Sequence, residues 1–112
     1  GLESLTASLT LIDPLGYLDL MSLTQDCAGV VTDSGGYQKE AYYAGKRAVV
    51  IMPDTGWREL TDCGWNILCS PQAPSLEKAL SALEEPRDYP QNLFGEGDAG
   101  ERIMQTLTKV LA

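Results

Sequence analysis

Histidine is absent from the 112 residues, so no histidine triad, imidazole acid–base pair or histidine metal site can form within this chain. Basic residues are also few, with 8 Lys and Arg against 16 Asp and Glu and a formal net charge of −8. A surface that binds nucleic acid or an anionic membrane needs clustered lysine and arginine, which this balance argues against. We expect no metal, no cofactor, no nucleic-acid partner and no membrane partner.

Long apolar runs and paired cysteines are missing as well. The longest unbroken apolar run, Ala48 to Met52, is far shorter than the roughly 20 residues that span a bilayer. The cysteines are Cys27, Cys63 and Cys69, an odd count without a C-x-x-C pair or an N-terminal signal pattern, which favours a reduced, cytoplasmic setting. A chain of 112 residues suffices for one small domain with a core.

The remaining pattern alternates strands and helices. We expect strands at residues 8–12, 28–32, 47–52 and 65–69, and helices at residues 17–26, 35–44, 57–63, 75–85 and from about 99 to the end. This order is typical of a parallel sheet with right-handed crossovers. Ligands of such sheets bind beyond the carboxyl ends of the strands, where residues 13–15, 33–36 and 53–56 are expected to share one edge.

One of these loops has the features of a phosphate site. Ser34, Gly35 and Gly36 stand between a β-branched run and a helical pattern. The first amides of a helix lack internal partners and carry partial positive charge, which suits a phosphate, and Ser34 is a good N-cap by type. Glu40 lies four residues after Gly36 on the same helix face, where a carboxylate suits ribose hydroxyls. An ordinary tight turn with a capping serine fits the same letters.

A second glycine-rich segment, residues 95–100, fits G-x-G-x-x-G letter by letter. A dinucleotide fingerprint needs a strand directly before it, and residues 88–92 do not read as one. We therefore interpret this segment as a turn that begins the last helix. Trp57 and Trp65 have side chains able to stack on a base or sugar, although core packing is favoured for each.

Four segments in the same order resemble the non-hydrolysing UDP-N-acetylglucosamine 2-epimerases. Residues 11–18 resemble the family's I-[DE]-P-L-x-Y-L, residues 32–41 match T-D-S-G-G-x-Q-x-E-A, residues 55–66 fall on T-E-W-x-E…G-W-N, and residues 92–103 resemble N-P-[YF]-G-[DE]-G-x-A…R-I. The resemblance implies an α/β, Rossmann-like, three-layer parallel sheet with about four strands present, part of the C-terminal domain of a glycosyltransferase-B-type fold. Residues 1–112 would be a partial UDP-binding domain without the N-terminal catalytic domain.

The resemblance also implies a reaction and a binding site. The parent enzyme would interconvert UDP-N-acetylglucosamine and UDP-N-acetylmannosamine for polysaccharide biosynthesis, by eliminating UDP and adding it back. UDP or a UDP-N-acetylhexosamine would contact Ser34, Gly35 and Gly36 at the diphosphate, Glu40 at the ribose and Leu20 beside the uracil. The family's proton-transfer carboxylates belong to its other domain, so we expect no catalytic residue in this fragment and no activity from it alone.

Three positions depart from the family pattern. Met52 stands where the family usually has Arg, Pro53 where it has Asp, and Gly56 where it has Glu. These losses indicate a different way of binding the substrate or a different sugar nucleotide.

Two other functions stay open from the sequence. One is a non-catalytic binding or assembly module that forms a homodimer through an unpaired strand edge. The other is a glycosyltransferase-B-type sugar transferase, although that class usually shows acid-to-acid spacing where this chain has Gln38 followed by Glu40.

Overall fold

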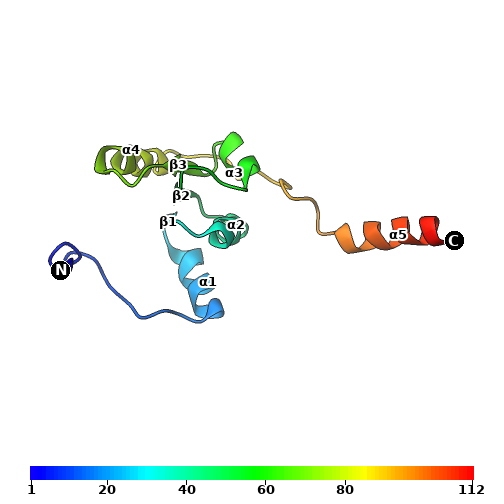
Figure 1. The fold of residues 1–112 in the computed structure, drawn as a ribbon, viewed down its shortest axis with the longest axis horizontal. Helices are drawn as coiled ribbons and strands as arrows, with labels where there is room; N and C mark the ends of the chain where they lie inside the picture. Colours follow the sequence, from blue (N-terminus) through cyan, green and yellow to red (C-terminus); the bar gives the residue numbers. More distant parts are fainter.

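The computed structural model describes residues 1–112 and shows a small parallel sheet with helices on both faces (Figure 1). The elements in chain order are α1 (Tyr17–Asp26), β1 (Val30–Thr32), α2 (Gly35–Tyr43), β2 (Ala48–Ile51), α3 (Arg58–Asp62), β3 (Ile67–Cys69), α4 (Ala73–Leu83) and α5 (Ala99–Leu111).

The sheet has three strands in the order β1-β2-β3, and both strand pairs are parallel. Val49 of β2 pairs with Val31 on one side and with Ile67 on the other. All three strands therefore end at the same edge of the sheet, which brings the segments after β1 and β2 side by side.

Alternation along β2 divides the core between two helices. Val50 points to the face covered by α2 and packs in one cluster with Val30 and Ala41. Val49 points to the opposite face and packs with Ala79 of α4. Successive side chains of a strand point to opposite faces, so α2, the sheet and α4 form three layers as the sequence predicted.

Local chemistry explains both ends of α2. The Ser34 side chain accepts a hydrogen bond from the Tyr37 amide, which caps the helix. Gly45 follows the last turn at φ 75°, a left-handed conformation that glycine adopts without a steric penalty. The expected helix at residues 35–44 is confirmed to within one residue.

The expected strand at residues 8–12 is wrong, and the sheet has three strands instead of about four. Leu9, Leu11 and Ile12 are exposed, and no strand pairs with this segment. A strand forms only where another backbone pairs with it, so β-branched composition alone does not produce one. The segment at residues 13–15 consequently follows no strand, and only the other two loops lie at the carboxyl edge of the sheet.

The two ends of the chain extend away from the sheet (Figure 1). The radius of gyration is 17.7 Å, whereas about 13 Å is usual for a compact chain of this length. Helix α5 forms where the sequence predicted it, but its apolar residues Ile103, Leu107, Val110 and Leu111 are all exposed. None of the helices is long and apolar enough to cross a bilayer.

Candidate functional site: the glycine-lined start of helix α2

The candidate site lies where β1 and β2 end. β1 ends at Thr32 and β2 at Ile51, so residues 33–36 and residues 52–57 form adjacent loops at the carboxyl edge of the sheet. The contact is direct, because the indole nitrogen of Trp57 donates a hydrogen bond of 2.6 Å to the Gly35 carbonyl oxygen. Two of the three loops predicted to share this edge therefore do so.

The loop before α2 is ordered by its own side chains. The Ser34 amide donates to the Thr32 hydroxyl at 3.0 Å, and the Tyr37 amide donates to the Ser34 hydroxyl at 3.4 Å. No side chain of the protein accepts a hydrogen bond from the Gly35 or Gly36 amide. These are first-turn amides, which also have no intrahelical acceptor. Two donors at the positive end of a helix thus remain available to an anion.

The start of α2 is open. A Cβ atom built on Gly35 or Gly36 meets no atom within 4 Å, and both residues are exposed. Neither glycine has a positive φ, the conformation that would favour glycine for backbone reasons. Packing and backbone conformation therefore leave both glycines unexplained.

Glu40 and Leu20 are the two remaining residues of the predicted site. Glu40 is half-buried one turn further along α2, and its carboxylate makes no ion pair within the chain. Leu20 is half-buried on α1, and its carbonyl oxygen accepts a hydrogen bond of 2.7 Å from the Thr24 hydroxyl. The Thr24 hydroxyl also lies 2.6 Å from the Tyr37 hydroxyl. The helix that carries Leu20 is thereby joined to the first turn of α2.

Sequence reasoning missed a buried polar bridge behind the opening. Gln38 is 1% exposed, and its side-chain oxygen accepts a hydrogen bond of 2.7 Å from the Thr55 hydroxyl. Its side-chain nitrogen donates to the Ser34 carbonyl oxygen at 3.2 Å. The spacing of the sequence could have indicated that Gln38 is buried, because Gln38 occupies the helix face that also buries Ala41 and Tyr42. A buried amide at such a position requires polar partners.

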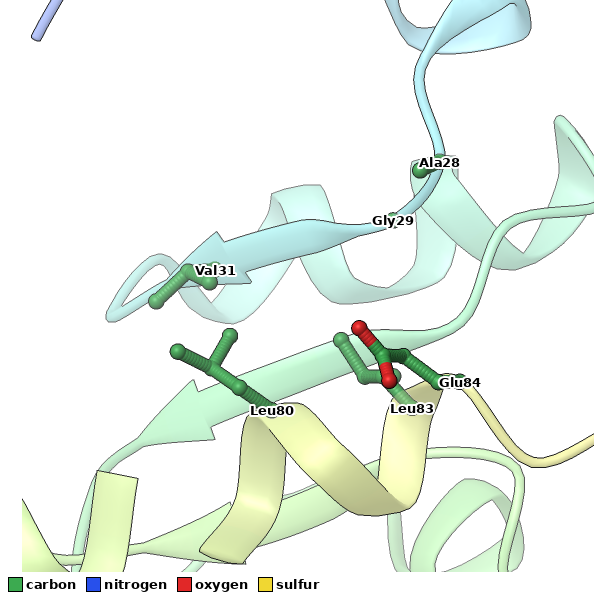
Figure 2. A pocket seen from close by; sticks show the side chains of 6 residues that line it. All are labelled: Ala28, Gly29, Val31, Leu80, Leu83 and Glu84. Carbon is green, nitrogen blue, oxygen red and sulfur yellow. The ribbon is translucent and has the colours of Figure 1, made fainter. Parts of the chain in front are cut away.

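Three hollows of similar volume lie near the sheet, and two of them border β1 or the carboxyl edge. One of about 360 Å³ is at the carboxyl edge, lined by Met52, Pro53, Leu68, Cys69, Ser70 and Ser75. The other, of about 390 Å³, lies between β1 and α4, where Val31, Leu80 and Leu83 point into an apolar space (Figure 2). An apolar lining does not suit a diphosphate. No group of His, Cys, Asp and Glu side chains in the structure has the arrangement of a metal site.

The family model described as UDP-N-acetylglucosamine 2-epimerase matches residues 1–108. The chain belongs to this family. A family member from Pseudomonas aeruginosa, named UDP-2,3-diacetamido-2,3-dideoxy-D-glucuronate 2-epimerase, is 38% identical over 107 residues, covering 95% of this chain and 30% of the relative. A UDP-N-acetylglucosamine 2-epimerase homolog from Methanococcus maripaludis is 34% identical over 100 residues. The match covers 89% of this chain and 28% of that relative.

Solved structures of family members share the fold. The UDP-GlcNAc 2-epimerase of Methanocaldococcus jannaschii, in complex with UDP-GlcNAc and UDP, matches with a TM-score of 0.74 and 35% identity over 88% of this chain and 27% of that one. The UDP-GlcNAc 2-epimerase of Neisseria meningitidis bound to UDP-GlcNAc matches with a TM-score of 0.75 and 29% identity. This match covers 96% of the present chain and 32% of the Neisseria chain. The chain thus spans about 30% of the curated relative from Pseudomonas aeruginosa.

Proposed function

We propose that these residues form the UDP-binding part of an enzyme that interconverts UDP-N-acetylglucosamine and UDP-N-acetylmannosamine. The diphosphate binds the Gly35 and Gly36 amides and the Ser34 hydroxyl, the ribose hydroxyls bind Glu40, and the uracil lies beside Leu20. In this proposal the catalytic carboxylates belong to an N-terminal domain outside the 112 residues, so the segment alone is inactive.

The two unexplained glycines carry this proposal. A glycine within a helix is about 0.5–1 kcal/mol less favourable than alanine. Alanine side chains at positions 35 and 36 would extend into open space, so neither the fold nor the packing requires glycine there. A ligand that must approach the backbone closely does require it, and the positive end of α2 favours an anionic one. Family membership supports a nucleotide-sugar diphosphate as that anion.

The chemistry of epimerisation gives the amides a task. The C1–O bond to the β-phosphate breaks with loss of the C2 proton, which leaves a glycal and free UDP. A proton then adds to the opposite face of C2, and UDP adds back at C1. Negative charge develops on the diphosphate as it departs, so fixed N–H donors at that point stabilise the transition state more than the bound substrate.

A second substrate has a specific observation in its favour. The relative from Pseudomonas aeruginosa at 38% identity is named for a diacetamido glucuronate substrate. Met52, Pro53 and Gly56 also lack the charges that the family motif usually carries in this loop. The UDP site proposed here is common to both substrates, because they differ in the sugar.

The test uses the natural full-length polypeptide that contains these residues. Incubation with each UDP sugar in D₂O, followed by ¹H NMR, should show the 2-epimer and one deuterium at C2. Transfer of the sugar to an acceptor without epimerisation would instead identify a sugar transferase. Absence of both reactions and of UDP binding would support a non-catalytic assembly module and reject the proposal.

Three further expectations belong to this proposal. The exposed edge of β1, with Val31 48% exposed, suits additional strands of the same domain. We also expect the parent enzyme to form a homodimer. We expect it to act in the cytoplasm, in polysaccharide biosynthesis. Sedimentation of the full-length polypeptide measures directly whether it forms a homodimer.

A further inference from the structure

The loop after β2 holds two carbonyl groups at the start of α2. The Trp57 indole N–H donates to the Gly35 carbonyl oxygen at 2.6 Å. The Gln38 side-chain amide donates to the Ser34 carbonyl oxygen at 3.2 Å. Neither bond reaches an N–H group that a phosphate would contact, yet both act on the same peptide units.

Peptide planarity makes these bonds relevant to the amides. The Ser34 carbonyl and the Gly35 N–H belong to one planar trans peptide, and the Gly35 carbonyl and the Gly36 N–H belong to the next. In a trans peptide the N–H points opposite to the C=O. Fixing the two carbonyl groups therefore fixes the directions of both N–H groups. The two carbonyls also accept the first backbone hydrogen bonds of α2, and glycine has no side chain that would restrain these planes further.

Gln38 and Trp57 are themselves held in place. The Thr55 hydroxyl donates to the Gln38 side-chain oxygen at 2.7 Å and accepts from the Trp57 backbone amide at 3.1 Å. Gln38 and Thr55 are 1% and 6% exposed, so water does not compete for these bonds. The Trp57 ring packs edge-on against Phe94 and lies under the Lys39 ammonium, 4.4 Å from the ring centroid.

We infer that Gln38 and Trp57 are positioning residues for the diphosphate: they hold the Ser34 and Gly35 carbonyls so that the Gly35 and Gly36 amides stay aimed at it. This inference rests on the proposed function, since it names what orients the proposed donors. Thr55 supports both residues through its hydroxyl. The role of Trp57 is thus to orient the phosphate site and not to stack on the base.

Trp57→Phe tests the inference in the natural full-length polypeptide, because it removes the indole N–H and keeps an aromatic ring. Trp65→Phe is the matched control, since the Trp65 indole also donates to a backbone carbonyl, that of Lys46 at 3.1 Å, at the opposite edge of the sheet. One hydrogen bond contributes about 1 kcal/mol, which is roughly fivefold in a dissociation constant. Calorimetric titration should show about fivefold weaker UDP binding for Trp57→Phe and unchanged binding for Trp65→Phe.

Ligand fragments separate positioning from stacking. Trp57→Phe should weaken UDP and inorganic pyrophosphate by the same factor and leave uridine binding unchanged. Weaker uridine binding would assign Trp57 to the base and overturn the inference. UDP binding equal to wild type, with a melting temperature lowered as in Trp65→Phe, would show a structural role only and overturn it as well.

A second pair of variants covers the case in which Trp57→Phe fails to fold. Thr55→Val keeps the side-chain volume and removes the hydroxyl, and Thr55→Ser restores the hydroxyl. UDP should bind roughly fivefold more weakly to Thr55→Val and normally to Thr55→Ser. If Thr55→Val and Thr55→Ser bound UDP with equal affinity, this inference would be contradicted and the proposed function would not. A wild-type protein that binds neither UDP nor pyrophosphate would contradict the proposed function itself.

Discussion

The hydroxyl of Tyr37 lies 2.6 Å from the hydroxyl of Thr24, and this contact joins α1 to the first turn of α2. The Thr24 hydroxyl proton goes to the Leu20 carbonyl oxygen, so Tyr37 donates in the pair. Thr24 is 1% exposed, which shields the contact from solvent. The residue that follows the two glycines thus fixes the helix that carries Leu20.

Removing the Tyr37 hydroxyl should destabilise the protein without disturbing the helices. Tyr37→Phe is expected to lower the free energy of unfolding by about 1 kcal/mol, the usual contribution of one hydrogen bond. Urea unfolding measures it. Tyr43→Phe is the control, because the Tyr43 side chain is 63% exposed and its hydroxyl makes no hydrogen bond. Equal stabilities of the two variants would show that the Thr24 contact contributes nothing.

Glu40 is predicted to bind the ribose and not the phosphates. Glu40→Ala should weaken UDP binding by roughly tenfold to a hundredfold, because hydrogen bonds to a charged group contribute about 1.5–3 kcal/mol. Pyrophosphate has no ribose and should bind as to wild type. Glu77→Ala, on the exposed face of α4, controls for the change in net charge. Equal loss of affinity for UDP and pyrophosphate would remove Glu40 from the ribose.

Arg47 is predicted to be the main polar support of the opposite sheet edge. Its guanidinium donates to five backbone carbonyl oxygens, those of Gly64, Trp65, Ala82, Leu83 and Glu85. Burial lowers the pKa of Arg47, and neighbouring Arg87 adds to the effect. The five carbonyl groups hold the guanidinium in place. They include the carbonyls at the end of α4, which have no partners within the helix.

Arg47→Lys should therefore lower the free energy of unfolding by roughly 2–3 kcal/mol, because an ammonium cannot reproduce the planar fork of donors. Arg102→Lys, on exposed α5, should change it by less than about 0.5 kcal/mol. Urea denaturation of both variants is the measurement. A loss of stability at position 47 no greater than at position 102 would contradict the role assigned to Arg47.

The sequence predicted the elements whose signals are local. The helix at residues 17–26 and the onset of the last helix at Ala99 were right, because apolar spacing and a glycine-rich turn define them within the segment itself. The strand at residues 8–12 was wrong because pairing depends on a partner strand. Periodicity likewise identified the apolar side of α5 but not a surface to cover it.

The candidate site divides in the same way. Ser34, Gly35, Gly36 and Glu40 lie in one turn-and-helix segment, so their spacing alone predicted their arrangement. The bridge from Gln38 to Thr55 joins helix α2 to the loop after β2, and only the parallel pairing of β1 and β2 brings these two segments together. Its members could be identified as polar residues at buried positions, but not as partners.

The affinity of the full-length polypeptide for UDP, with Gly36→Ala as the variant, tests the central claim most directly. An alanine side chain at position 36 meets open space within the protein, so stability should stay equal or rise by up to about 1 kcal/mol. UDP binding should fall roughly tenfold, because the methyl group occupies the path of the diphosphate to the amides. Gly100→Ala, in α5 and equally open, should leave UDP binding unchanged. Undiminished UDP binding to a folded Gly36→Ala protein would contradict the account.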